Sequence, residues 1–342
     1  MTAWRPETSR YHRAMSFLAL LFALLIEQAR PLANDNWVHR SLRGWTTWLS
    51  QNLDAGHPRL AWTTWSLAVG TPALLALLMH WGLMWLFGWP IAMVWSVGVL
   101  YVALGFRQFS HHFTDIRDAL DVGDERLARE LLAQWQHVSV GSLPRSELLR
   151  HVIEHSVLSA HRHVFGVLAW FSVLAALGLG PAGAVLYRMS ELVSRAWSVP
   201  PGTSAGWVSD TLQLTGREAW RKVDWLPARI TAVAFAVVGN FEEAIDCWRN
   251  HAQRFPDDND GVVLSATSGA LGVRLGGEAL RADVDIVSAA HGADLHEPQD
   301  SESTPGRAPE LAHLASVVGL VWRTVVLWMV LLALLTLARL LG

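Results

Sequence analysis

Cysteine and charge are both scarce in this sequence. Its 342 residues include a single cysteine, Cys247, and only 17% are charged, against about 25% in an average soluble domain. One cysteine excludes an intrachain disulfide and argues against a cysteine-based metal site. The formal net charge of -3, with no basic stripe along the chain, argues against a nucleic-acid-binding protein.

Apolar residues are abundant and are gathered in long runs. They make up 51% of the chain, and 19 tryptophans stand against three tyrosines. Tryptophan is enriched where membrane helices meet the headgroup region. The runs at 61–87, 89–105, 164–180 and 314–337 are long enough, or nearly so, to cross a bilayer. We therefore predict an all-α, polytopic integral membrane protein with four to six membrane-embedded helices and amphipathic or soluble helices between them.

The ends of the chain differ from its middle. Residues 1–14 form a polar N-terminal extension, and the apolar run that follows ends at Glu27. We interpret this run as an uncleaved anchor or a half-inserted helix. Residues 15–342 then form a single membrane domain. Within it, residues 283–310 are rich in Asp, Glu, Ser, Pro and Gly, which predicts a mobile loop.

Polar segments separate the apolar runs. An amphipathic interfacial helix is expected within 34–60, one helix over 115–137, and another over 147–163 that continues into the apolar run after it. A further helix over 181–199 has three charges on one face, because their spacings are three and four: Arg188, Glu191 and Arg195. Charges at membrane depth normally face protein or water.

A polar stretch at the mouth of a short apolar segment is the strongest candidate site. Asp224, Trp225 and Arg229 lie within six residues, just before the apolar run 231–238. A guanidinium group can bind a carboxylate or phosphate through two hydrogen bonds. The alternative is that Arg229 forms a structural pair with Asp224. We weigh the two equally and predict a polar anion site at the membrane surface.

A second polar stretch follows about thirty residues later. Asp257, Asp258 and Asp260 could hold Mg²⁺ through their carboxylates, although an Asx-rich turn before a helix is the simpler explanation. Gly276 and Gly277 could let the backbone approach a phosphate, although a glycine pair more often ends a helix. Both alternatives stay open.

Several histidines lie close together in the sequence. His151 and His155 are four residues apart and share one helical face, with His161 and His163 shortly after them. Imidazole is a good zinc ligand. No third ligand is fixed by spacing, so histidines that hydrogen-bond their neighbours are the favoured interpretation.

Two of these stretches resemble the CobD/CbiB family of membrane proteins. The segment 224–229, D-W-L-P-A-R, is similar to the family's L-P-A-R-L element, and 269–277, G-A-L-G-V-R-L-G-G, is similar to its G-A-L-G-x-x-L-G-G run. Pro256 and Asn259 lie where the family has S-P-N. The resemblance implies ATP- and Mg²⁺-dependent joining of a corrinoid acid to an aminopropanol phosphate, as in adenosylcobinamide-phosphate synthases. The implied ligand-binding residues are Asp224, Trp225, Arg229, Asn259, Arg274, Gly276 and Gly277.

The middle of the chain departs from that family. Its V-E-T-x-x-E-N-x-x-D-G element corresponds to 152–166, where Glu154 keeps one acid and the E-N-x-x-D-G part becomes H-R-H-V-F-G. Candidate catalytic residues are therefore Glu154, Asp224 and Arg229. The middle also resembles AmpE, a bacterial inner-membrane protein associated with β-lactamase induction, in the residues around Arg162 and in D-W-x-P-x-R.

Two functions follow from these resemblances. The first is a non-synthase, AmpE-like sensor or regulator that binds an anionic ligand. The alternative is an adenosylcobinamide-phosphate synthase, for which Mg²⁺ and ATP would be needed. Either would be a multi-pass protein of the bacterial inner membrane, with the lipid bilayer and a phosphorylated or corrinoid small molecule as partners. No nucleic-acid partner is expected, and a homo-oligomer is compatible with the sequence.

Overall fold

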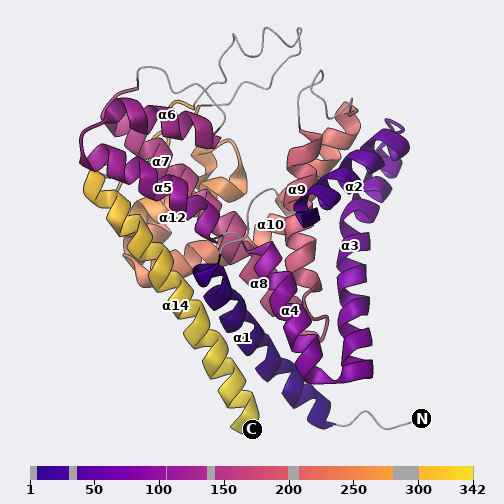
Figure 1. Cartoon of the computed structure of the whole chain (residues 1–342). Helices are drawn as coiled ribbons and strands as arrows, with labels where there is room; N and C mark the ends of the chain where they lie inside the picture. The colour runs from indigo at the N-terminus through magenta and orange to yellow at the C-terminus, as the bar shows by residue number, and fades with distance from the viewer. Residues whose placement is uncertain are drawn as a thin grey trace. The chain divides into compact units, whose positions relative to one another are not determined.

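The computed structural model describes residues 6–30, 37–104, 106–136, 143–198, 208–279 and 300–341 (Figure 1). Every regular element in these ranges is a helix, apart from one isolated β-bridge between Val273 and Arg307. The all-α prediction is thus confirmed. Residues 1–5 of the N-terminal extension and residues 283–299 of the expected mobile loop lie outside the described ranges.

Thirteen α-helices are described along the chain. Their bounds are α1 Pro6–Ala29, α2 Trp37–Leu53, α3 Pro58–Phe87, α4 Trp89–Ala103, α5 Phe106–Asp121, α6 Glu125–Gln136, α7 Arg145–Ala160, α8 Gly166–Ala176, α9 Ala182–Trp197, α10 Asp210–Val238, α11 Phe241–His251, α12 Asp258–Leu271 and α14 Leu311–Leu341. A π-helical turn, His161–Phe165, joins α7 to α8, and a 3-10 turn, Ala252–Arg254, follows α11.

These helices form two compact units. Unit 1 consists of Met1–Phe106, Arg162–Asp224 and Trp328–Gly342, and unit 2 consists of Arg107–His161 and Trp225–Leu327. The chain thus alternates between the units rather than completing one before the other.

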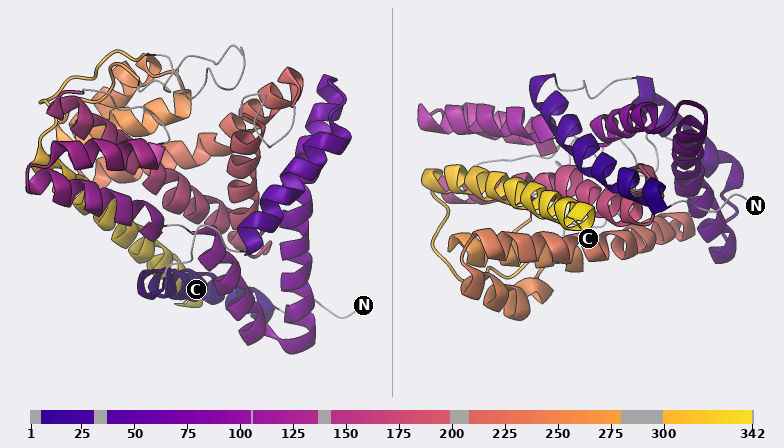
Figure 2. Two further views of the ribbon diagram at one scale, coloured as in Figure 1. Left: turned by 45° about the horizontal axis from the view of Figure 1, so that its top comes forward. Right: turned by 90° about the horizontal axis from the view of Figure 1, so that it is seen from below.

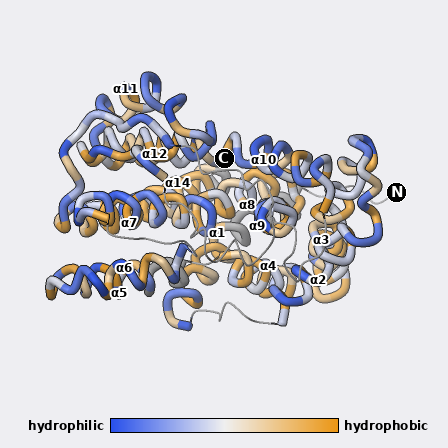
Figure 3. The backbone as a smooth tube through the Cα atoms, turned by 90° about the horizontal axis from the view of Figure 1, so that it is seen from above, coloured by the Kyte–Doolittle hydropathy of each residue, from blue (hydrophilic) through white to orange (hydrophobic). Residues whose placement is uncertain are grey.

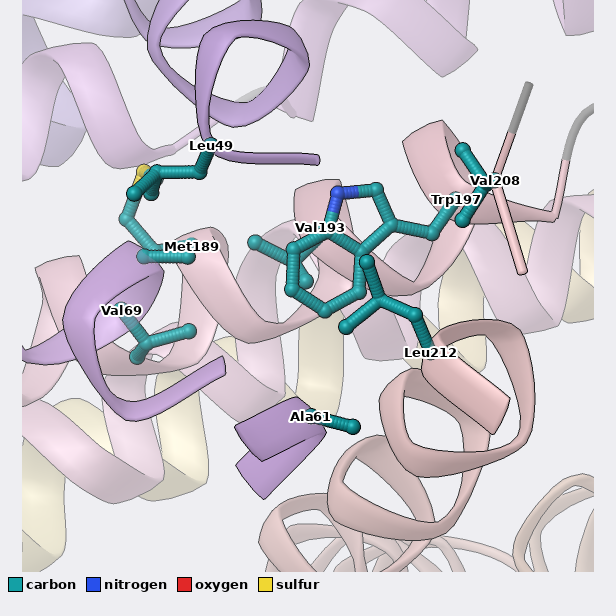
Figure 4. Packing of buried hydrophobic residues seen from close by; sticks show 9 residues of the cluster. Leu49, Ala61, Val69, Met189, Val193, Trp197, Val208 and Leu212 are labelled. Carbon is teal, nitrogen blue, oxygen red and sulfur yellow. The ribbon is translucent and has the colours of Figure 1, made fainter. Parts of the chain in front are cut away.

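In unit 1, α9 packs against α3 and α8, and α1 packs against α4. Gly88, with a φ of 79°, makes the tight turn between α3 and α4 that the short link predicts. The core around α9 joins Trp197 and Val193 to Leu49 of α2 and Leu212 of α10 (Figure 4). The indole N–H of the buried Trp197 donates to the carbonyl oxygen of Thr46 over 3.3 Å, so this large side chain leaves no unpaired donor.

Small residues let helices of unit 1 approach closely. A Cβ atom on Gly166 would clash with the ring of Tyr187, and one on Gly183 would clash with the carbonyl oxygen of Trp170. Both contacts are between α8 and α9, which explains why these two helices can bury an aromatic ring and a backbone carbonyl at their interface.

In unit 2, α11 and α12 lie side by side (Figure 2). Gly269 of α12 lies against the backbone of Glu243 in α11, where no side chain would fit.

The helix predicted over 115–137 is in fact two helices, α5 and α6, so that prediction was wrong. Gly123 has a φ of 80° and the Asp124 carboxylate accepts from Leu127 N–H, which starts α6 anew. Hydrophilic and hydrophobic residues alternate along both helices (Figure 3).

Three helical segments are long and apolar enough to cross a membrane by length and composition: Pro58–Phe87, Arg145–Ala176 and Leu311–Ala338. Two shorter apolar helices, Phe17–Ala29 and Trp89–Ala103, accompany them. Large apolar side chains remain exposed on α3 and α14, among them Leu74, Leu78, Leu331 and Leu334. Such continuous apolar exposure is expected where lipid replaces water. The chain is therefore a helical membrane protein, as predicted.

Candidate functional site

The first site of interest lies where α10 meets α12. Arg229 of α10 donates from Nη1 to the amide oxygen of Asn259 over 2.7 Å and to the carbonyl oxygen of Trp225 over 3.0 Å. Its guanidinium carbon lies 4.5 Å from the centroid of the Trp225 ring, a cation–π distance. Asn259 is buried, whereas Trp225 is exposed. The structure thus brings together three predicted ligand-binding residues that lie up to 34 positions apart in the chain.

The first turn of α12 supplies the acidic residues. Asp257 is the N-cap, and its Oδ1 accepts from the backbone N–H groups of Asn259 and Asp260 at 2.9 and 3.1 Å. This is the Asx-turn arrangement that the sequence left open, and it fixes Asn259 beneath Arg229. Asp258 is exposed on the same turn. No group of three His, Cys, Asp or Glu side chains in the described ranges is placed to hold a metal ion.

A second polar centre joins α7 to the glycine-rich run after α12. Arg150 donates to both carboxylate oxygens of Glu154 at 3.0 Å, to Glu147 at 2.8 Å and to the carbonyl oxygen of Glu278 at 2.6 Å. The backbone N–H of Gly276 donates to Glu154 Oε1 over 2.7 Å. Glu154, predicted as a catalytic candidate, is therefore engaged on both sides by protein donors.

The glycine-rich run is held by the segment that precedes α14. Gly277 N–H donates to Ser301 Oγ over 3.0 Å, and Leu275 N–H to Thr304 Oγ1 over 2.8 Å. The backbone N–H of Arg274 donates to the Arg307 carbonyl oxygen, while the side chain of Arg274 is exposed. These backbone N–H groups already donate to protein acceptors, so the glycine-rich run is held in place by contacts within the protein. Its role in binding a ligand remains a prediction.

Asp224 lies in unit 1 and has a different partner from the one proposed for it. It is buried, and its Oδ1 accepts from the hydroxyl of Tyr187 over 2.7 Å. The neighbouring carbonyl oxygen of Val223 accepts from the indole N–H of Trp170 over 2.9 Å. The two neighbouring residues of the motif therefore have different contacts. Asp224 joins α10 to α9, and the Trp225 ring lies against the guanidinium group of Arg229.

The histidines are dispersed among different contacts. His151 contacts Arg150, His155 stacks edge-on against Trp135 with ring centroids 4.4 Å apart, and His161 bonds Thr231 over 2.9 Å. These contacts agree with the favoured interpretation of neighbour-bonded side chains.

Arg150 and Tyr187 were missed by sequence reasoning. The signal for Arg150 was present, because Glu147 and Glu154 lie three residues before it and four after it, on one helical face. Tyr187 carried no such signal, since its partner Asp224 is 37 residues away on another helix.

Comparison with known proteins overturns one prediction. The chain is 32% identical over 273 residues to a protein of Stutzerimonas stutzeri named cobalamin biosynthesis protein CobD, covering 79% of this chain and 80% of that protein. The proteins of the same name from Chromobacterium violaceum and Mycobacterium tuberculosis are 34% and 29% identical, with 54% and 55% of this chain covered and 55% and 58% of the relative. The AmpE-like regulator that we favoured from the altered middle segment is therefore wrong. The names of these relatives agree with the alternative prediction, a protein of cobalamin biosynthesis.

No solved structure matches the chain. The sequence matches the family described as CobD/Cbib protein over residues 18–305. That range includes both polar centres and all helices from α2 to α12. The chain belongs to the CobD/CbiB family.

Proposed function

We propose that this chain is a membrane-bound synthase of cobalamin biosynthesis, of the adenosylcobinamide-phosphate synthase type. It would form an amide bond between a carboxyl group of a corrinoid acid and the amine of an aminopropanol phosphate, at the expense of ATP. The observation that carries the proposal is the match to CobD over four-fifths of the length of a relative. We further propose that it is a multi-pass protein of the bacterial inner membrane.

Arg229 and Asn259 are the residues best suited to the phosphate chemistry of this reaction. Two of the proposed substrates, ATP and the aminopropanol phosphate, carry phosphate groups. Arg229 offers a planar, permanently charged group, and its position is fixed by Asn259 and by the Trp225 ring. A donor whose position is fixed in advance stabilises developing charge without further reorganisation. Arg229 would thus bind and orient the phosphate.

The acidic first turn of α12 fits a magnesium ion that is held mainly by phosphate. Mg²⁺ usually takes one or two carboxylates and fills its remaining positions with phosphate oxygens and water. Asp258 is exposed and Asp260 is half-buried on the turn that also bears Asn259. These two carboxylates would hold the ion, which would neutralise phosphate charge. Asp257 is already committed to capping the helix.

Complementation tests the proposal directly. The chain is expressed in a bacterium that lacks its own cobinamide-phosphate synthase, and growth that depends on corrinoid synthesis is measured. Wild type should restore growth, and Arg229→Gln should not. Arg249→Gln, an exposed arginine on α11 of the same unit, is the matched control and should behave as wild type. Failure of the wild-type chain, with the protein present in the membrane fraction, would refute the synthase assignment.

A further inference from the structure

Unit 1 contains a cluster of basic side chains that the proposed synthase reaction does not use. It is formed by α2, α9 and the π-helical turn before α8, and we call it the α2–α9 basic cluster: His39, Arg43, His163, Arg188 and Arg195. Helix α2 packs directly against α9. Arg188 acts electrostatically on both His39 and His163, so it is the member that joins the α2 and π-turn parts of the cluster.

One carboxylate lies within the cluster. Glu191 is buried on α9 and forms ion pairs with Arg188, one turn before it, and with Arg195 over 2.8 Å, one turn after it. Glu191 alone pairs with two arginines, and two further arginines act on the histidines, Arg43 on His39 and Arg162 on His163. Burial, together with the charges of Arg188 and Arg43, lowers the pKa of His39, because nearby positive charge disfavours the protonated imidazole.

Within the part of the chain that the structure describes, the cluster also contains a buried ring nitrogen without a hydrogen-bond partner. Nδ1 of His163 is buried and has no hydrogen-bond partner among the described residues. Buried polar atoms normally find a partner, in the protein or in a bound molecule. Arg195 provides the access, because its side chain is 58% exposed, whereas that of Arg188 is 20% exposed.

The surroundings of the cluster are those of a membrane interface. Helix α2 exposes Trp37 and Trp48, and Trp45 stacks on Trp48 with ring centroids 5.7 Å apart. Tryptophans so arranged prefer the headgroup level of a bilayer. The adjoining α3 is a candidate membrane span that exposes Leu60 and Leu67. A basic group at this level meets lipid headgroups.

We propose that the α2–α9 basic cluster binds the phosphate group of an anionic phospholipid. The phosphate would accept hydrogen bonds from Arg188 and Arg195, which Glu191 holds in place. A neutral His163 with its proton on Nδ1 would be a third donor. Arginine suits this task because its donors match the geometry of phosphate oxygens. The lipid's acyl chains would lie along α3.

Lipid retention on the purified full chain tests the proposal. The protein is placed in nanodiscs of phosphatidylcholine with phosphatidylglycerol, and the co-purifying lipid is counted by native mass spectrometry. Wild type should retain phosphatidylglycerol in preference to phosphatidylcholine. Arg195→Gln should reduce this preference about fivefold, the effect of one arginine charge at an anionic surface. The matched control Arg249→Gln, an exposed arginine on α11 of unit 2, should leave it unchanged.

The remaining outcomes are equally decisive. Arg195 is mostly exposed, so its replacement leaves the fold intact, and Arg43→Gln gives a second variant outside the Glu191 pairs that should also weaken retention. Equal retention of both lipids by wild type, or unchanged retention in both variants, would overturn the proposal. Displacement of phosphatidylglycerol by millimolar inorganic phosphate would assign the cluster to a soluble phosphate compound and overturn the lipid source.

Discussion

Arg229 and Asn259 are joined by a 2.7 Å hydrogen bond that ties the middle of α10 to the first turn of α12. The bond fixes the arginine that we propose binds phosphate. Because Asn259 is itself held by the Asp257 cap, the orientation of Arg229 depends on a chain of two local contacts.

The energetic coupling of this pair can be measured. Arg229→Gln, Asn259→Ala and the double variant should give a coupling free energy of about 0.5–3 kcal/mol, because the two side chains share one partly buried hydrogen bond. Thermal unfolding in detergent is the measurement. The exposed pair Glu218 and Lys222, 2.7 Å apart, should show almost no coupling in a matched cycle. Equal coupling free energies in both cycles would show that the Arg229–Asn259 hydrogen bond stabilises the fold no more than an exposed ion pair does.

Glu154 should matter for stability more than for binding. Glu154→Gln removes the charge that Arg150 faces in a buried position, and the loss of one partner of a buried pair costs about 3–5 kcal/mol. We expect a lower unfolding temperature and faster proteolysis after residue 272. Glu130→Gln breaks an exposed pair of the same i, i+4 spacing and should change neither. A Glu154→Gln chain as stable as wild type but without activity would make Glu154 a catalytic residue.

Gly166 is predicted to be intolerant of any side chain. Gly166→Ala places a methyl group into the ring of Tyr187, and overpacking of this kind costs about 1–3 kcal/mol. Gly98→Ala, in a helix with open space around the added carbon, should instead be neutral or slightly stabilising. The unfolding temperatures of the two variants compare them directly. A benign Gly166→Ala would contradict the close α8–α9 contact.

The capping and metal-binding roles of the acidic turn can be separated. Asp257→Asn keeps a side-chain cap, whereas Asp257→Ala should cost about 0.5–2 kcal/mol of stability. Asp258→Asn and Asp260→Asn should remove Mg²⁺-dependent protection from proteolysis and leave stability without metal almost unchanged. If the protection by Mg²⁺ survives both changes, the turn serves as a cap and holds no ion.

Cys247 should react slowly with alkylating agents. Burial raises the pKa of its thiol above the ordinary value, and the thiolate is the reactive form. Iodoacetamide at pH 8 should modify the folded chain far more slowly than the chain in denaturant. Because the folded-state pKa is raised, the thiol's contribution to stability is present at neutral pH and lost as the pH rises above about 8.5. Rapid modification of the folded chain would show that this thiol is accessible.

Much of the fold could be predicted, because the spacing of apolar residues and the length of the apolar runs are compatible with few structures other than helices. The runs predicted at 61–87, 89–105 and 314–337 correspond to α3, α4 and α14. The break at Gly123 was missed because the apolar residues on either side of it keep a helical spacing. A single glycine with positive φ outweighed that pattern.

The candidate site was less predictable than the fold. The motif resemblance identified Arg229 and Asn259 as candidates. The run of Asp and Asn residues before a helix predicted the turn that Asp257 caps. The partners that matter most are distant in sequence: Tyr187 for Asp224, and Glu154 for Gly276. Such contacts depend on helix packing, which no local pattern encodes. The altered residues at 161–166 favoured a regulator, but similarity along most of the chain outweighs the loss of one motif.

The alternation of the chain between two units has a consequence for its biosynthesis. The boundaries at His161, Asp224 and Leu327 fall inside continuous helical segments, at the π-helical turn, within α10 and within α14. Unit 2 is therefore incomplete until residue 327 has been translated, although its first residues, from Arg107 onward, follow directly on the first segment of unit 1. Glu154 and Arg150 are therefore translated long before the glycine-rich run 269–277, whose Gly276 N–H donates to Glu154. Stalled or prematurely ended chains should accordingly be targets for membrane proteases.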